Sequence, residues 1–173
     1  FGSSSRTGTS LGGENVVGRL AMVGIASLFI LNKNGSLIYN QDFAPDKVLS
    51  ANDKIRLAST FHGISAIASQ ISPWQRPSAG SLGFLQPNGI LALDADTFRL
   101  QCFHTLTGMK FFCILLPPLR DCEELLRQVY ASYVDYVLKN PFQELDMPIR
   151  CELFDKEVRR LVADSQAVSG YPR

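Results

Sequence analysis

Few side chains in this sequence have types and spacings that could carry out covalent or metal chemistry. The two histidines, His62 and His104, show no arrangement that predicts a base beside a nucleophile, which a catalytic triad needs. The four cysteines lack the C-x-x-C spacing of a zinc site. No G-x-x-x-x-G-K-[ST] phosphate loop occurs. We therefore predict no catalytic, cofactor-binding or metal-binding residue.

The cysteines leave one chemical alternative open, a thiol enzyme using Cys102 or Cys113, which would need an exposed thiol of low pKa. A two-residue turn at Thr107-Gly108 would set Cys102 directly opposite Cys113 on one side of a hairpin. One extra loop residue would send the two side chains to opposite faces. We expect two reduced, buried thiols, because so few cysteines indicate an intracellular protein; a redox switch is the alternative.

The composition of the chain is that of an ordinary globular protein. The 173 residues are 46% hydrophobic and 19% charged, with a formal net charge of +1, so no basic field predicts nucleic-acid binding. The longest apolar runs, Met22–Leu31 and Phe111–Leu116, are far shorter than the roughly 20 residues of a membrane span. Residues 1–21 are rich in Gly, Ser and Thr and are expected to be a flexible leader or a cloning remnant. Residues 22–173 are expected to form one domain.

Five segments have the patterns of β-strands, and two of them are apolar on both faces, as central strands of a covered sheet are. Asn34-Gly35 predicts a two-residue turn of the first hairpin, which would pair Leu31 with Ile38 and Ile30 with Tyr39. The five expected strands are Ile25–Leu31, Leu37–Asn40, Ile90–Leu93, Phe98–Phe103 and Lys110–Leu116, of which the first and last are the central pair.

Three helices are expected. Ser50 can cap the first, which ends before Pro73 and has an apolar face at Leu57, Phe61, Ile64, Ala68 and Ile71. The second begins near Asp121 and stops at Lys139-Asn140-Pro141, and the third covers about Cys151 to Asp164.

These elements predict an α/β (α+β) fold with a five-stranded mixed sheet. If the two doubly apolar strands are neighbours, the spatial order is second, first, fifth, fourth, third. Strand directions that alternate along the chain would make the first and fifth strands parallel. The first helix is expected to cover one face and the other two helices the opposite face.

Several segments of this chain resemble the synbindin-type subunit of the TRAPP vesicle-tethering complex, in the right order over about residues 25–162. The segments that carry the resemblance are Leu31–Tyr39, Leu57–His62, Asp96–Cys102, Thr105–Phe111, Leu138–Phe142 and Met147–Asp155. The resemblance implies a longin-like (SNARE-like) fold, whose strand order agrees with the one above. Only Gln41–Leu49 lie where animal members carry a PDZ-like insertion, so the chain resembles the short form.

The resemblance implies a non-enzymatic subunit that binds no cofactor itself. Its implied partners are other TRAPP subunits, including a sister longin-like subunit, and, through the assembled complex, a Rab-family GTPase. Its implied location is cytoplasmic, peripheral at cis-Golgi and ER–Golgi membranes. The alternative is the longin regulatory domain of a SNARE-like protein, which predicts a downstream heptad segment and a C-terminal span; the sequence ends at Arg173 with neither.

Partner contacts are expected from three parts of the chain. Tyrosine is enriched at interfaces, and residues Tyr130, Tyr133 and Tyr136 cannot all share one narrow helix face, so at least one phenol should be exposed. Arg150 is expected to hold the start of the last helix through carboxylates or free carbonyls. The expected partner-binding residues are Leu57, Phe61, Tyr133, Tyr136, Arg150 and Glu152.

Overall fold

A computed structural model describes residues 24–71, 89–117, 121–144 and 146–168. It contains a five-stranded sheet in the order β2-β1-β5-β4-β3, as the sequence predicts. The strands are β1 (Ile25–Leu31), β2 (Leu37–Asp42), β3 (Ala92–Asp94), β4 (Arg99–His104) and β5 (Lys110–Leu115). The helices are η2 (Pro45–Lys47), α1 (Ala51–Ile71), α2 (Glu123–Tyr133), the π-helical η4 (Val134–Leu138) and α3 (Glu152–Val168). The expected boundary at residue 21 lies outside the described residues.

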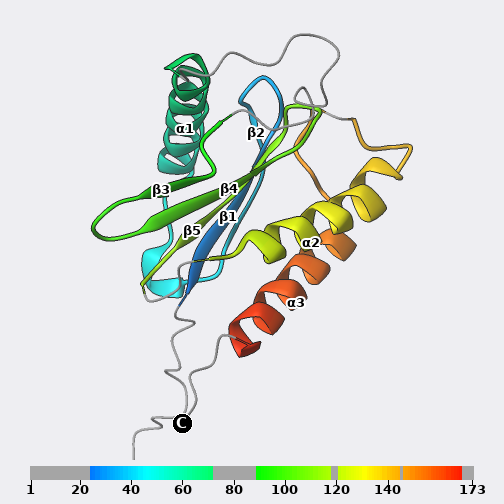
Figure 1. The fold of residues 1–173 in the computed structure, drawn as a ribbon. Helices are drawn as coiled ribbons and strands as arrows, with labels where there is room; N and C mark the ends of the chain where they lie inside the picture. Colours follow the sequence, from blue (N-terminus) through cyan, green and yellow to red (C-terminus); the bar gives the residue numbers. More distant parts are fainter. Residues whose placement is uncertain (1–23, 72–88, 118–120, 145, 169–173) are drawn as a thin grey trace, which may run out of the picture.

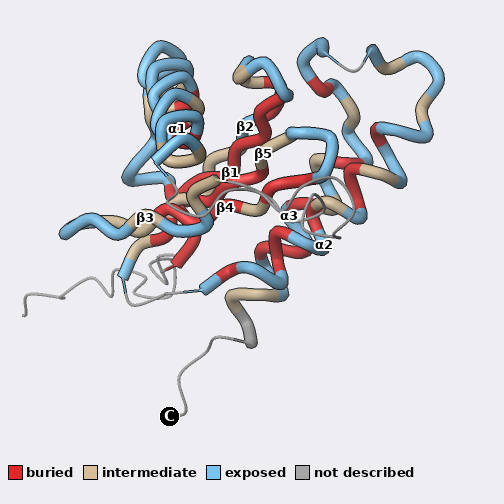
Figure 2. The backbone as a smooth tube through the Cα atoms, turned by 45° about the horizontal axis from the view of Figure 1, so that its top comes forward, coloured by how far each residue is buried: buried red, intermediate tan, exposed pale blue. Residues whose placement is uncertain are grey.

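Helix α1 covers one face of the sheet, and α2 and α3 cover the other (Figure 1). Successive side chains of a strand point to opposite faces, so β1 feeds both cores. Phe29 stacks on Phe112 at 4.8 Å between ring centroids, and Phe61 of α1 packs against Phe112. On the opposite face, Leu28 and Ile30 belong to the larger core, which α2 and α3 complete. Figure 2 shows that β1 is the most continuously buried strand, and every one of its residues is buried.

The predicted parallel pairing of the first and fifth strands is wrong. Strands β1 and β5 are antiparallel, with Phe29 opposite Phe112, so the sheet is antiparallel throughout rather than mixed. The reason lies in the connection through α1. The helix carries the chain back along the sheet, so β2 and β3, at opposite edges, run in the same direction, and simple alternation of direction does not hold across the helix.

The two hairpin turns are three-residue loops rather than the predicted two-residue turns. In the first, Asn32 N–H donates to the Ser36 carbonyl at 3.0 Å, and Gly35 alone adopts a positive φ of +86°. In such a loop a type I turn is followed by one residue in the left-handed region, so Asn34 keeps an ordinary φ. Ile30 pairs with Tyr39 as expected, but Leu31 pairs with Leu37.

The same loop geometry changes the expected position of the cysteines. Gly108, at φ +85°, ends the β4–β5 loop, and Cys102 lies opposite Phe112 rather than opposite Cys113. The two thiols therefore belong to different cores, Cys102 beneath α1 and Cys113 beneath α2 and α3. All four cysteines are free. A disulfide switch between Cys102 and Cys113 is ruled out by this register.

Ser50 caps α1 as predicted, because its Oγ accepts a hydrogen bond from Asp53 N–H at 3.2 Å and donates one to Asp53 Oδ2 at 2.7 Å. The predicted inner face of this helix is partly wrong. The buried stripe runs through Ala58, Phe61 and Ser65, whereas Ile64 and Ile71 are exposed. At 100° per residue, these two isoleucines lie roughly 60–80° around the helix from Phe61.

Candidate partner-binding surfaces

The histidine and cysteine side chains of the sheet serve as packing groups. His104 Nε2 lies 2.9 Å from the Ile90 carbonyl oxygen and 3.4 Å from Cys102 Sγ, and burial lowers the pKa of this imidazole. Burial raises the pKa of the Cys102 thiol to about 12 and raises that of Cys113 as well. A nucleophilic thiol needs a shift in the opposite direction, so the pKa shifts argue against the thiol-enzyme alternative.

The described residues contain no group of three or more His, Cys, Asp or Glu side chains placed to hold a metal ion. Among the helices that the structure describes, none is both long and apolar enough to span a membrane.

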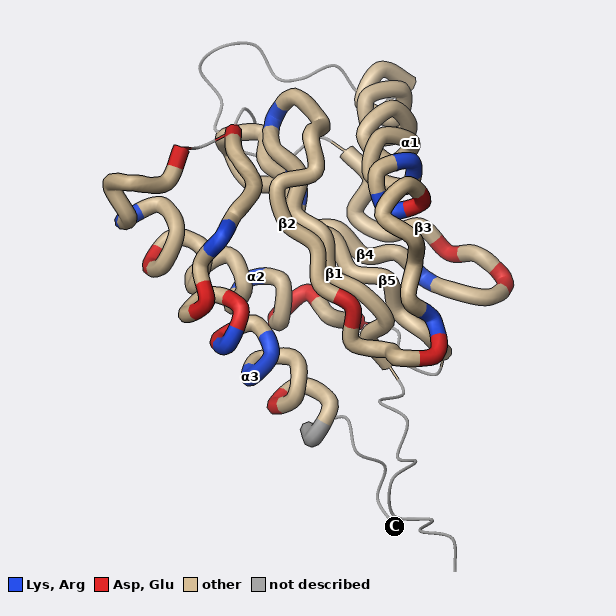
Figure 3. Tube along the Cα trace, turned by 180° about the vertical axis from the view of Figure 1, so that it is seen from behind, with Lys and Arg blue, Asp and Glu red and all other residues tan. Residues whose placement is uncertain are grey.

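The outward face of α1 is unusually apolar for a surface helix. Residues 57–71 contain no Asp, Glu, Lys or Arg, and Figure 3 shows charge on α1 only near its first turns. Ile67 is 57% exposed and Ile71 72%, with Ile64 beside them. A Cβ added to Gly63 would meet nothing within 4 Å, so nothing in the described chain requires glycine there. We call residues Gly63, Ile64, Ile67 and Ile71 the α1 outer surface.

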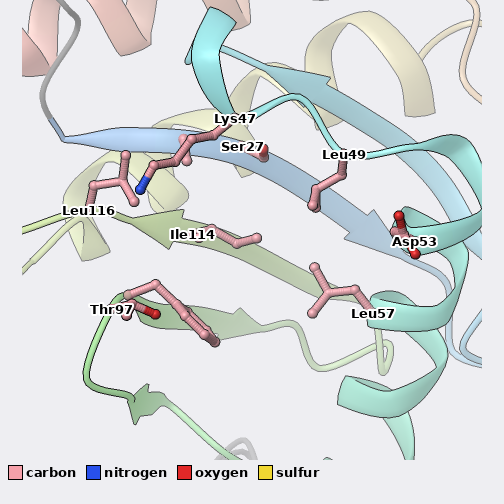
Figure 4. Close-up of a pocket in the computed structure, with 10 residues that line it drawn as sticks. Ser27, Lys47, Leu49, Asp53, Leu57, Thr97, Ile114 and Leu116 are labelled. Atoms are coloured by element: carbon pink, nitrogen blue, oxygen red, sulfur yellow. The ribbon is translucent and has the colours of Figure 1, made fainter.

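An apolar groove of about 400 Å³ lies between α1 and the sheet. In Figure 4, Leu49, Leu57 and Ile114 surround the same space, from the segment before α1, from α1 itself and from β5. Lys47 lies at the end of the groove near Leu116. The described lining of the groove is largely apolar, and its polar members, Ser27, Lys47, Asp53 and Thr97, are interspersed with apolar residues.

A second exposed apolar region lies at the other side of the molecule, where η4 leads through a turn into α3 (Figure 1). Each of its apolar members is more than a third exposed, and Phe142 is 94% exposed. Cys151 Sγ lies 3.9 Å from the Tyr136 carbonyl oxygen and joins the two ends of the region. We call it the η4–α3 surface; its apolar members are Tyr136, Leu138, Phe142, Met147 and Leu153.

The six expected partner-binding residues fall into three groups by their burial. Phe61 and Tyr133 are buried in the two cores, so they support the surfaces from beneath and have almost no area to offer a partner. Leu57 is half-buried and lines the groove. Tyr136, Arg150 and Glu152 are exposed. Arg150 and Glu152 flank Cys151, whose Sγ lies 3.9 Å from the Tyr136 carbonyl oxygen. Tyr136 is the exposed phenol that the tyrosine spacing predicts.

Arg150 does not fix the start of α3 in the predicted way. It is exposed, and no hydrogen bond or ion pair joins it to another described residue. The backbone just before α3 is held to β2 instead, because Ile149 is buried and its N–H donates to the Ile38 carbonyl at 2.8 Å. Asp155 N–H then donates to the Cys151 carbonyl at 3.0 Å in the first turn.

The sequence prediction missed the outward isoleucine Ile67 and the turn residue Phe142. The sequence could have indicated the exposed Ile67, because fifteen consecutive residues without Asp, Glu, Lys or Arg are unusual in a surface helix. For Phe142 the sequence holds only an aromatic after Asn140-Pro141, and its exposure depends on how the turn packs.

A five-stranded antiparallel sheet with α1 on one face and α2 and α3 on the other defines the longin-like class of α+β domain. Its described surface offers apolar regions suited to protein contacts. The chain belongs to the sybindin-like family, whose family model matches residues 25–165.

Curated relatives carry consistent names. The chain is 49% identical over 138 residues to trafficking protein particle complex subunit 4 of Dictyostelium discoideum, an alignment that covers 80% of this chain and 96% of the relative. It is 48% identical over 111 residues to subunit 4 of Bos taurus, covering 64% of this chain but 46% of the bovine protein. It is also 25% identical over 133 residues to subunit 1 of Dictyostelium discoideum, covering 75% of this chain and 88% of that protein.

The connection between β2 and α1 agrees with the short form of the family. Asp42 ends β2 and Ala51 begins α1, with only the short helix η2 between them.

Proposed function

We propose that this chain is a non-catalytic subunit of a trafficking protein particle (TRAPP) tethering complex. The observation that carries the proposal is the 49% identity to a subunit 4 over nearly the whole of that relative. Exchange factors act by distorting the nucleotide site of a GTPase, so such a subunit needs shape and a few contacts rather than a cofactor pocket. In this proposal the assembled complex acts as exchange factor for a Rab-family GTPase, on cis-Golgi and ER–Golgi membranes.

The α1 outer surface supports the proposal of a sister longin-like partner. Isoleucines without neighbouring charges lose water when another apolar helix covers them, and a glycine lets two helix backbones approach closely. Subunit 1 of Dictyostelium discoideum is similar in sequence to this chain over three quarters of its length. A subunit of that kind would have an equivalent helix with which to cover α1.

The first experiment is co-purification of this chain with its own organism's subunit 1 relative. Ile67→Glu should abolish the co-purification, because a carboxylate would be buried without a partner. Leu106→Glu is the matched control: Leu106 is 70% exposed, lies in the β4–β5 loop, and should tolerate the change. Equal binding by both variants would rule out α1 as the contact.

The exchange role needs a separate experiment. The reconstituted complex, with and without this chain, is mixed with candidate Rab GTPases loaded with a fluorescent guanosine diphosphate. We expect faster nucleotide release only when the chain is present. Release at the same rate without it would contradict a role in exchange while leaving the tethering role open.

A further inference from the structure

Both histidines of the chain lie next to one lysine, on the face of the sheet that α1 covers. Lys110, the first residue of β5, pairs with His104 across the β4–β5 hairpin. Its ammonium nitrogen also lies 3.4 Å from Nδ1 of His62, which belongs to α1. A neutral imidazole that accepts a hydrogen bond from Lys110 at Nδ1 carries its proton on Nε2. His62 then keeps one N–H donor for a further group.

The β1–β2 loop brings a second lysine to the same end of the sheet. Gly35 of this loop packs against the His62 ring so closely that an added Cβ would lie 2.5 Å from His62 Cγ. Lys33 lies two residues earlier, and its Cβ is 3.4 Å from the position that a Cβ on Gly108 would take. Lys33 is exposed, whereas His62 and Lys110 are half-buried. Three elements thus place two lysines and one histidine where β1 ends and β5 begins.

No described carboxylate neutralises this cluster. Lys54 is paired with Asp42 and Lys139 with Asp135, but no Asp or Glu of the described residues forms an ion pair with Lys33 or Lys110. Burial lowers the pKa of Lys110, and burial and the charge of Lys110 lower the pKa of His62. An anion bound between these groups would favour their charged forms and oppose both shifts.

The cluster lies on a different flank of α1 from the α1 outer surface. At 100° per residue, His62 lies about 100° around the helix from the buried Phe61. Ile64, Ile67 and Ile71 lie roughly 60–120° around the helix in the other direction. A subunit that covers the isoleucines therefore contacts the flank opposite to His62.

We propose that Lys33, His62 and Lys110 form a binding site for a phosphate monoester. Such a group carries about −1.5 to −2 charge at pH 7, which matches the two positive charges of the lysines. A carboxylate, with a single negative charge, would leave one lysine unneutralised. Lysine binds phosphate as a point charge, and His62 adds a directed N–H donor.

The monoester can belong to a soluble molecule or to a phosphoinositide headgroup, because both present the same terminal phosphate. The site uses residues of this chain alone, so the proposal does not depend on assembly into a TRAPP complex.

The first experiment is calorimetric titration of the full chain with glycerol phosphate, a soluble monoester. At an ionic strength of about 0.15 M, attraction to distant surface charges is largely screened. We expect one site with a dissociation constant below about 1 mM, and no measurable binding of acetate. Acetate binding as tight as that of glycerol phosphate would overturn the assignment to phosphate.

The second experiment distinguishes the two sources with vesicles. Phosphatidylcholine vesicles that contain phosphatidylinositol phosphate present a monoester. Vesicles brought to the same total charge with phosphatidylserine present only a phosphodiester and a carboxylate. Preference for the first vesicles without binding of glycerol phosphate assigns the site to a lipid headgroup, and the reverse result assigns it to a soluble ligand. If glycerol phosphate does not bind and neither vesicle is preferred, the proposal fails.

Lysine variants then locate the site with whichever of these two probes binds. Lys33→Gln and Lys110→Gln should each weaken binding by at least about fivefold, as expected when a charge-assisted hydrogen bond is lost. Lys156→Gln is the matched control, because Lys156 is exposed on α3, forms no ion pair with another described residue and carries the same charge. Equal losses in all three variants would mean that only overall charge matters, and would overturn the site. Because Lys33 is exposed, its variant tests the site even if Lys110→Gln fails to fold.

His62→Phe separates the geometry of the site from its charge. At pH 7.5 this substitution keeps a ring beside Gly35 and changes almost no charge, but it removes the N–H donor. We expect binding of the same probe to weaken by at least about threefold. Unchanged binding would contradict a site that includes His62.

Discussion

At the scale of single residues, His104 shows how a side chain capable of chemistry is used for packing. It is almost fully buried, its Nε2 lies against the Ile90 carbonyl oxygen, and burial and the charge of Lys110 lower its pKa. The carbonyl can only accept, so Nε2 carries a proton and the buried imidazole is neutral with that tautomer. Protonating the second nitrogen would place a charge in the core.

This pKa shift predicts acid sensitivity. The folded pKa of His104 lies below its ordinary value of 6.5, so the unfolded chain binds more protons as the pH falls below 6.5. The stability that the neutral imidazole contributes is present above pH 6.5 and is lost progressively below it, by at most about 1.4 kcal/mol per pH unit. Urea unfolding between pH 7.5 and about 5 measures it.

The comparison that isolates His104 is a variant with no titration. His104→Gln should be less stable than the wild type at neutral pH but should show a shallower loss below pH 6.5. Parallel curves for the two proteins would show that His104 does not cause the acid sensitivity.

The cysteines provide a second prediction at this scale. Alkylation with iodoacetamide requires a thiolate, and Cys102, with a pKa near 12, and the fully buried Cys113 form little of it at pH 8. We expect mass spectrometry of the native protein to show modification of the half-exposed Cys151 first, and of Cys102 and Cys113 only after unfolding. Rapid modification of Cys102 in the native protein would revive the thiol-enzyme alternative.

At the scale of the elements, two glycines with different surroundings should respond in opposite ways to alanine. Gly35 sits at φ +86°, and an added Cβ would lie 2.5 Å from His62 Cγ. Gly63 lies in α1 with open space where its Cβ would be. We expect Gly35→Ala to destabilise the chain by more than about 1 kcal/mol. Gly63→Ala should stabilise it by about 0.5–1 kcal/mol.

Urea unfolding of the isolated chain tests both substitutions, and each serves as the control for the other. The Gly63 variant also informs the proposed contact on α1: a stabilised chain that binds the subunit 1 relative less tightly indicates close helix packing at Gly63. A destabilised Gly63 variant would mean that the helix is strained at this residue in a way the structure does not show.

At the scale of the whole molecule, two separate exposed apolar surfaces favour association between isolated chains. A formal net charge of only +1 provides little electrostatic repulsion against it. We expect the isolated chain to self-associate as its concentration rises, as measured by size-exclusion chromatography with light scattering. The double variant Ile67→Lys, Phe142→Lys should stay monomeric, whereas Leu106→Lys should behave as the wild type does. A monodisperse wild-type monomer at high concentration would contradict this prediction.

The sequence alone determined which segments are strands and helices and which strands are central. Apolar residues on both faces, as in Ile25–Leu31, are stable only in the middle of a covered sheet, so that pattern fixed the strand order. The glycines of the hairpins, Gly35 and Gly108, marked the turns correctly. These features are local, because they depend on the period of the side chains and on the φ that one residue can adopt.

Only the tertiary structure decided direction, register and exposure. The return of the chain through α1 made β1 and β5 antiparallel, and one extra residue in the β4–β5 loop moved Cys102 and Cys113 to different faces. Exposure likewise depends on what covers a residue. Phe61 and Tyr133, both expected to bind partners, are buried, whereas Phe142 and Arg150 are exposed. Strand direction and burial are set by contacts between segments far apart in the chain, which no local pattern encodes. The register of the β4–β5 hairpin depends instead on the length of its loop, which the Thr-Gly pair alone did not specify.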